Sequence, residues 1–218
     1  VYPPLCLGCR QPRDTESLLC DHCRQLLSYL EHPICLHCTR PITVGAECPT
    51  CTERLPLFAL GDHLGPLQQA VIALKYHHVR RVATWASAEL VARQKVRVAD
   101  LSPNALVPAP LHAGREYFRG FNQAELLADH LSKGLDLDVR CDLVIRKKHR
   151  RVQSRLSGAR RYANVRGVFE ALPCLEKVER ILIVDDVVTS GATVKELTRV
   201  LSEAGHQVIG VMAIAHRG

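Results

Sequence analysis

Short apolar runs and amphipathic segments alternate along residues 105–215. Apolar residues at spacings of three and four predict helices, and short runs of consecutive apolar residues predict strands. The predicted helices cover 68–79, 82–96, 122–135 and 193–204. The predicted strands cover 105–109, 143–145, 180–185 and 207–214. Asn122 is placed to cap the third helix. The alternation predicts an α/β fold with a parallel sheet and flanking helices.

The first 52 residues lack this periodicity and carry eight of the ten cysteines. These cysteines form four Cys-x-x-Cys pairs, Cys6/Cys9, Cys20/Cys23, Cys35/Cys38 and Cys48/Cys51. Two such turns bring four thiolates to one tetrahedral zinc ion, so the segment predicts two structural zinc sites. We favour consecutive pairing of the turns, although interleaved pairing also satisfies the spacing.

Disulfides and thiol redox chemistry are the competing interpretations of the cysteines. A disulfide framework needs an oxidising compartment, and no secretory signal is visible in the sequence. A redox motif is normally a single Cys-x-x-Cys on an α/β core, not four on a small ribbon. A segment this short and this poor in large apolar residues needs a staple to fold, and zinc supplies one. Proline and glycine at positions 56, 61, 65 and 66 predict a linker over 52–66.

Composition and charge narrow the class of protein. With 47% hydrophobic and 23% charged residues in 218 positions, the chain is typical of globular proteins, not of disordered ones. The longest apolar run, 208–215, is far shorter than the roughly 20 residues of a membrane-spanning helix. The net charge of +7 is uneven, because ten Lys or Arg and a single acid lie between Arg140 and Arg166. A basic surface suits phosphate-bearing partners, either nucleic acid or a polyphosphate metabolite.

The segment 181–193 is the main candidate for a ligand site. A buried-type strand ends in Asp185 and Asp186, and a short Thr/Ser/Gly turn leads into a helix. Ligands of open α/β sheets bind at the carboxyl ends of strands, and backbone N–H groups at a helix start can hold a phosphate. Gly191 lets the backbone approach such a group closely. The two acids would be repelled by a phosphate, so we expect them to face a ribose diol and not to be salt-bridged into the protein.

Two sets of residues carry a resemblance to known proteins. Four apolar residues, two acids, two residues and Thr-Ser-Gly-x-Thr at 181–193 resemble the phosphoribosyl-pyrophosphate (PRPP) loop of type I phosphoribosyltransferases. The stretches 106–112 and 119–124, with the shorter matches 74–76, 153–157 and 164–167, resemble the ComF/GntX family, which includes the competence protein ComFC. Members of that family join an amino-terminal double zinc ribbon to a phosphoribosyltransferase domain. The resemblance implies a double zinc ribbon at 1–55 and a type I phosphoribosyltransferase-like domain at 56–218.

The resemblance also implies roles for individual residues. Asp185 and Asp186 would bind the ribose hydroxyls of PRPP. The residues that follow would form the PRPP loop, with 189–193 around the 5′-phosphate: Val187, Val188, Thr189, Ser190, Gly191, Ala192 and Thr193. Arg115 and Arg119 would approach the pyrophosphate, because a planar guanidinium pairs well with phosphate oxygens. Lys75 would point at the phosphates, or it is a surface lysine with its stem along the helix. The segment 146–161 would close over the site, although Arg150 stands where the family often has Thr.

Two functions follow from the resemblance, and both stay open at this point. The first is a Mg²⁺-dependent phosphoribosyl transfer from PRPP to an unknown acceptor. The second is a non-catalytic module that senses PRPP and binds DNA. The family link implies a role in natural transformation, with incoming single-stranded DNA and other competence proteins as partners. It places the protein in the cytoplasm, at the periphery of the inner membrane.

Overall fold

A computed structural model of the chain describes residues 4–13, 17–44, 48–51, 54–111, 114, 119–147, 166–173 and 178–217. Its helices are α1 (Asp21–Gln25), α2 (Gly65–Tyr76), α3 (Arg81–Ala99), α5 (Gln123–Leu135) and α7 (Ala192–Glu203). Its strands are β1 (Ile34–Cys35), β2 (Pro56–Asp62), β3 (Ala105–Pro108), β4 (Asp138–Val139), β5 (Val144–Arg146), β6 (Phe169–Ala171), β7 (Arg180–Val188) and β8 (Gln207–His216). None of the helices among these residues is long and apolar enough to cross a membrane.

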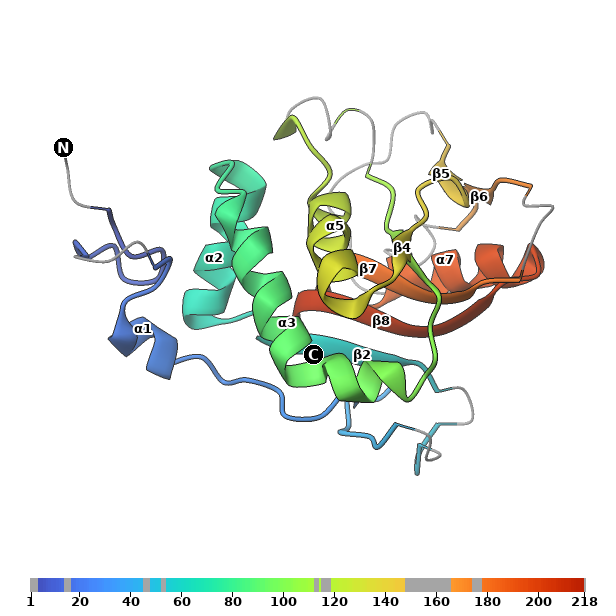
Figure 1. Ribbon diagram of the computed structural model, residues 1–218, viewed down its shortest axis with the longest axis horizontal. Coiled ribbons are helices and arrows are strands. Elements are labelled where there is room, and N and C mark those ends of the chain that lie inside the picture. The colour runs from blue at the N-terminus through green and yellow to red at the C-terminus, as the bar shows by residue number, and fades with distance from the viewer. Residues whose placement is uncertain are drawn as a thin grey trace.

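A six-stranded sheet in the order β1-β2-β8-β7-β3-β4 forms the centre of the fold (Figure 1). In this sheet the strands β2, β8, β7, β3 and β4 run parallel to one another, and β1 at the edge is antiparallel to β2. A separate hairpin pairs β5 with β6. The predicted α/β fold with a parallel sheet is thus confirmed.

Two hydrophobic layers pack against the two faces of this sheet. Along β7, Leu182 and Val184 join a cluster with the buried residues of α2, α3 and α5. Ile181 and Ile183, which alternate with them, join a second cluster with α7. Successive side chains of a strand point to opposite faces, so a strand covered on both faces has to be apolar throughout. This burial explains the continuous apolar run of β7.

The predicted linker over 52–66 is wrong. Its middle part is β2, a buried strand whose Leu57 and Phe58 pair in parallel with Val211 and Met212 of β8. Pro56 occupies the first position of the strand, where the missing N–H is tolerated. The proline and the glycine therefore mark the two ends of a buried strand, and reading them as loop signals hid the four apolar residues between them.

The other elements lie close to their predicted positions. The helix predicted at 122–135 is α5, and the Asn122 side chain caps it by accepting a hydrogen bond of 3.0 Å from the Ala124 N–H. The strand predicted at 180–185 extends to Val188, and the helix predicted at 193–204 is α7. The closing segment predicted at 146–161 lies almost wholly outside the described residues.

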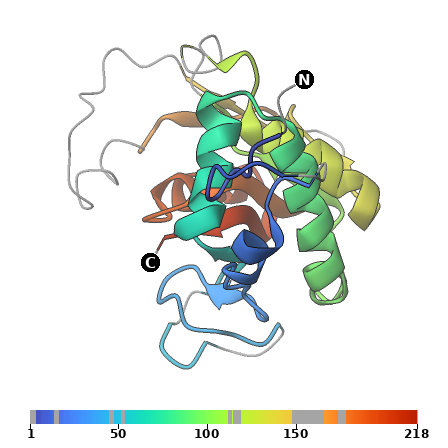
Figure 2. The same cartoon turned by 90° about the vertical axis from the view of Figure 1, so that its left-hand side faces the viewer.

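The two halves of the cysteine-rich segment pack on opposite faces of the sheet that contains β2. Figure 2 shows the first half, in dark blue, in front of the helices α2 and α3. Cys6 and Cys23 of its first half are buried in the cluster that contains α2 and α3. Ile34 and Leu36 of its second half belong to the cluster on the opposite face of the sheet. Between the halves, the Leu30 N–H donates a hydrogen bond of 2.8 Å to the Leu60 carbonyl of β2. The segment thus shares the core of the α/β part, and β1 extends the main sheet across the predicted domain boundary.

Gly61 marks the closest approach between this segment and β2, and it gives a test of their packing. A methyl group at position 61 would press directly on the backbone carbonyl oxygen of Ser28. Gly61→Ala is therefore expected to destabilise the protein by about 1–3 kcal/mol, the usual range for overpacking, in denaturant unfolding. Gly210→Ala in β8 is the matched control, because its methyl would meet the end of the Leu182 side chain at 2.9 Å. An equal loss in both variants would contradict the close backbone contact.

Candidate functional site

The eight paired cysteines gather into two groups of four. The Sγ atoms within each group lie within 4.8 Å of one another, and the groups are Cys6, Cys9, Cys20 and Cys23, and Cys35, Cys38, Cys48 and Cys51. All eight are free thiols. The structure therefore groups consecutive turns and not interleaved ones. Four converging sulfurs match the tetrahedral ligand set of structural zinc.

In each group of four cysteines, hydrogen-bond donors favour the thiolate form of one cysteine, which is the form that binds a metal ion. Burial pushes the pKa of Cys6 upward, but backbone N–H groups, led by that of Cys20 at 3.3 Å, lower the pKa to about 6. In the second group the Thr50 hydroxyl and backbone N–H lower the pKa of Cys48 to about 6. Burial and the neighbouring thiols raise the pKa of Cys23 and of Cys51 to about 12. Four thiolates this close together repel one another unless a metal ion neutralises their charge. The residues of each group therefore fit a zinc ion.

The turn between β7 and α7 has the geometry of an anion site. Thr189 and Ser190 are exposed, and Gly191 adopts a left-handed backbone with φ of 68° immediately before the first turn of α7. Gly191 stands at the N-cap position and makes no side-chain cap hydrogen bond, so within the part of the chain that the structure describes the start of α7 is left uncapped. The positive end of the helix dipole and the N–H groups of the first turn favour a phosphate. The predicted order of strand, turn and helix is therefore present, and the binding of a ligand by residues 187–193 stays a prediction.

Behind this turn lies a residue of the second cysteine group. Leu36, between Cys35 and Cys38, is buried, and its side chain would lie 3.4 Å from a Cβ atom placed on Gly191. The turn between Cys35 and Cys38 thus lies directly behind the β7–α7 turn.

The two acids at the end of β7 have different surroundings. The Lys75 Nζ, from the last turn of α2, lies 2.8 Å from the Asp186 Oδ1, with 19% and 12% of the two side chains exposed. Asp185 accepts a hydrogen bond of 2.8 Å from the Asp186 backbone N–H. Asp186 is therefore salt-bridged in this state, contrary to the expectation that both acids face a ligand. The salt bridge lies at the carboxyl edge of the sheet, so Lys75 has to move or be shared before Asp186 contacts a ribose.

Asp185 is an unusual carboxyl group. Burial, and secondarily the charge of Asp186, raise its pKa from 3.8 to about 7, while the charge of Lys75 opposes the shift. Near neutral pH this group can therefore gain or lose a proton. A carboxyl group held in this way by its neighbours is more typical of functional sites than of ordinary surface acids.

The raised pKa predicts how stability depends on pH. The folded protein keeps a proton on Asp185 up to about pH 7, whereas the unfolded chain loses it near pH 3.8. Stability therefore falls as the pH rises from about 4 to 7. Asp185→Asn removes this effect, so we expect the variant to melt at a higher temperature than the natural sequence at pH 8 and to differ less at pH 5. Asp138→Asn, an exposed acid on β4, is the control, and an equal pH dependence in both variants would contradict the assignment.

The predicted pyrophosphate arginines are only partly placed. Arg115 lies outside the described residues. The Arg119 guanidinium donates a hydrogen bond of 2.9 Å to the Gln123 Oε1 and lies 5.2 Å from the centre of the Tyr76 ring. Tyr76 follows Lys75 on α2, so Arg119 lies at the same corner of the molecule as the cation that pairs with Asp186.

A second polar cluster at this edge is absent from the sequence prediction. The His216 Nε2 at the end of β8 lies 2.8 Å from the Asp62 Oδ1 at the end of β2. The His63 N–H donates a hydrogen bond of 2.6 Å to the His216 carbonyl oxygen. Burial, with the charges of Lys75 and Arg217, lowers the pKa of His63. A correct assignment of β2 would have placed Asp62 and His63 at the same edge as the acids of β7.

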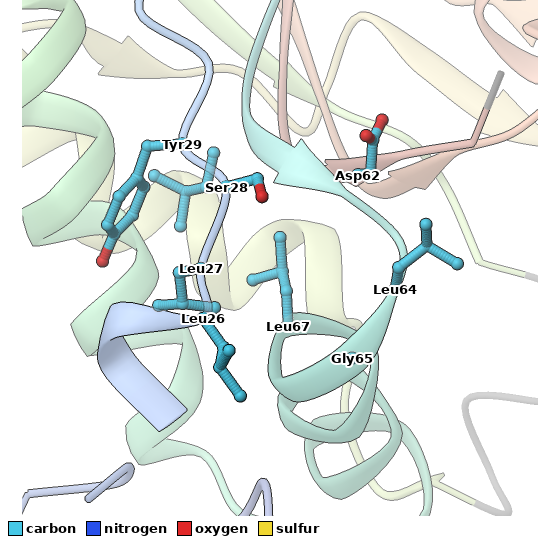
Figure 3. Close-up of a pocket in the computed structure, with 9 residues that line it drawn as sticks. Leu26, Leu27, Ser28, Tyr29, Asp62, Leu64, Gly65 and Leu67 are labelled. Carbon is cyan, nitrogen blue, oxygen red and sulfur yellow. The ribbon is translucent and has the colours of Figure 1, made fainter. Parts of the chain in front are cut away.

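A small cavity of about 130 Å³ opens beside Asp62 (Figure 3). Leu26 and Tyr29 line it from the stretch between the two cysteine groups, and Leu67 lines it from α2. Leucines from α2, β2 and the stretch after α1 line it together with polar groups, and Asp62 is the charged residue among those that line it. It contains none of the residues predicted to bind PRPP, so it is separate from the β7–α7 turn.

Known proteins match both the segment with the two cysteine groups and the part of the chain with the β7–α7 turn. A family model of the double zinc ribbon domain matches residues 1–52, and a family model of the phosphoribosyl transferase domain matches residues 120–218. Competence protein F of Haemophilus influenzae is 29% identical over 226 residues, which cover 96% of each chain. DNA utilization protein YhgH of Escherichia coli K12 is 29% identical over 98% of this chain and 97% of its own.

A third relative is more distant. Competence protein ComFC of Bacillus subtilis is 28% identical over 86% of this chain and 79% of its own. The two domain models and the full-length relatives together confirm the resemblance carried by the motifs. The chain thus combines a match to the double zinc ribbon domain with a match to the phosphoribosyl transferase domain, and over most of its length it is similar to the competence proteins F and ComFC and to the DNA utilization protein YhgH.

Proposed function

We propose that this protein binds PRPP at the carboxyl end of β7 and transfers its phosphoribosyl group to an acceptor. The turn between β7 and α7 carries this proposal, because it joins a helix start without a side-chain cap to a pair of carboxylates. We further propose a zinc-ribbon domain at 1–55 and a PRPP-binding domain at 56–218.

The described residues suit the two ends of PRPP. N–H groups and hydroxyls at the start of α7 would hold the 5′-phosphate, and ionised Asp185 would accept hydrogen bonds from the ribose hydroxyls. Lys75 and Arg119, at the neighbouring corner, would hold the pyrophosphate. PRPP would bring Mg²⁺ on its pyrophosphate oxygens, where the ion supplies charge neutralisation.

The reaction then requires little covalent chemistry from the protein. The bond between the anomeric carbon and the pyrophosphate oxygen breaks, pyrophosphate keeps the electron pair, and a nucleophilic atom of the acceptor bonds to the carbon. The sugar passes through a state of oxocarbenium character. A carboxylate beside the ribose favours that positive charge, and the cations favour the departing pyrophosphate.

The names of the relatives suggest where this activity is used. Competence protein F and DNA utilization protein YhgH are named for competence and for DNA utilization. We propose that the protein acts on the cytoplasmic side of the inner membrane, together with other competence proteins, in handling incoming single-stranded DNA. The non-catalytic alternative, a PRPP-sensing module that binds DNA, uses the same two ligands without transfer.

One experiment separates the two functions. The zinc-loaded protein is incubated with PRPP, Mg²⁺ and candidate acceptors, either free bases or single-stranded DNA, and released pyrophosphate is measured. Release that depends on an acceptor supports transfer. Calorimetric binding of PRPP without release supports the sensing module, and absence of PRPP binding contradicts both.

A further inference from the structure

An exposed group of aromatic and cationic side chains lies at the corner where α2 turns into α3. We call it the aromatic–arginine cluster, and it consists of Tyr76, His78, Arg80, Arg119 and Phe121. The Arg80 guanidinium carbon lies 4.7 Å from the centre of the Phe121 ring, and that of Arg119 lies 5.2 Å from the centre of the Tyr76 ring. The His78 and Phe121 rings are tilted against each other at 6.2 Å. Two segments of the sequence, 76–80 and 119–121, therefore build one surface.

The cluster is open to solvent and positively charged. The Tyr76 side chain belongs to the exposed large hydrophobic groups, with 63% of the residue accessible. His78 and Arg80 are also exposed. Within the described ranges neither Arg80 nor Arg119 forms an ion pair with an acid. Arg80 lies over the Phe121 ring, and Arg119 contacts the Tyr76 ring and the Gln123 side chain. A guanidinium that rests its face on a ring keeps N–H groups at its edge for phosphate oxygens.

Other contacts between arginine and aromatic rings in the molecule have a different character. Phe169, which lies under Arg146, is buried in the core, and Arg93 over Tyr29 is also bound to Glu89. A buried ring cannot stack on a ligand, and an arginine held by a carboxylate offers less charge. The cluster at the α2–α3 corner combines a free ring face with cations that have no acidic partner among the described residues.

We propose that the aromatic–arginine cluster binds single-stranded nucleic acid, with a base stacked on Tyr76 and the flanking phosphates on Arg80 and Arg119. Every base has an apolar face that stacks on an aromatic ring, and single strands leave that face accessible, whereas a duplex covers it. The positive charge of the cluster complements the phosphates. This inference rests on the proposed function, because the role of a bound strand depends on PRPP binding nearby. Tyr76 follows Lys75 on α2, so a single strand held here would present its bases beside the PRPP loop.

The test measures binding of fluorescein-labelled oligothymidine to the zinc-loaded protein by fluorescence anisotropy. Stacking of one base contributes about 1–3 kcal/mol, so Tyr76→Ala is expected to weaken binding at least about five-fold, while Tyr76→Phe restores it. An abasic deoxyribose-phosphate oligomer of the same length should bind Tyr76→Ala and the natural sequence equally. Arg80→Gln should reduce the slope of log affinity against log salt by about 0.7, the contribution of one phosphate on a single strand.

The control is Lys133→Gln, which removes one exposed positive charge from α5. If Tyr76→Ala binds oligothymidine as tightly as the natural sequence, or if Lys133→Gln weakens binding more than Arg80→Gln does, the inference is overturned. A preference for duplex over single strand also overturns it. PRPP calorimetry on the natural sequence is a separate measurement. If the protein binds oligothymidine but not PRPP, the proposed function is contradicted. If it binds PRPP but not oligothymidine, the inference about the aromatic–arginine cluster is contradicted.

Discussion

Asp185→Asn combined with Asp186→Asn is expected to abolish PRPP binding while the protein stays folded. Both acids lie at the carboxyl end of β7, and Asp185 is enclosed enough for its pKa to rise to about 7. Hydrogen bonds to an ionised group contribute about 1.5–3 kcal/mol each, so the loss of two such acceptors weakens binding by about 100-fold or more. Titration calorimetry with PRPP and Mg²⁺ at pH 8 measures the change.

Two further variants make that result specific. Asp138→Asn removes the same charge from an exposed position of β4 and should leave PRPP affinity unchanged. Asp186→Asn alone also breaks the salt bridge to Lys75, so its comparison with Asp185→Asn separates the acid that faces the ligand from the acid that holds the lysine. An unchanged affinity in the double variant would exclude the ribose role.

Loss of the first zinc site is expected to destabilise the whole protein, not only its amino-terminal part. Cys6 and Cys23 are buried in the same cluster as Leu67 and Val71 of α2. Zinc binding stabilises small ribbons by more than their own core can. Cys6→Ser should therefore lower the zinc content from two ions per chain to one, and should lower the melting temperature by about 10 °C or more.

Cys141→Ser is the matched control for the zinc prediction. Cys141 is a free, exposed cysteine that belongs to neither group of four, so its replacement should preserve both the zinc content and the melting temperature. Metal analysis and calorimetric melting measure the two quantities. A metal-free protein whose eight cysteines form disulfides would refute the zinc assignment.

Local patterns in the sequence predicted the elements whose environment is uniform. Apolar residues at spacings of three and four located α5 and α7, and a continuous apolar run located β7, because each of these elements packs against the core. The Cys-x-x-Cys spacing predicted four turns with two thiolates each, because two residues between cysteines already define a turn, whereas the grouping of consecutive turns was settled by the structure. Both signals lie within one element or one turn, where spacing alone specifies geometry.

The sequence did not predict features that depend on distant partners. β2 is a strand because it pairs with β8, about 150 residues further along the chain, and its own proline and glycine suggested a loop. The position of Asp62 and His216 at one edge follows from that pairing. The salt bridge of Lys75 with Asp186 joins a helix end to a strand end, so no spacing in the sequence specifies it.

Because Leu36 lies behind the turn at Gly191, the second zinc site is expected to support the proposed PRPP site. A chain that lacks its second ion would leave this turn without support, even if the rest of the sheet stayed intact. When zinc is scarce, such a molecule would bind PRPP more weakly before it unfolded. Constant PRPP affinity while the second group is emptied would rule out this dependence.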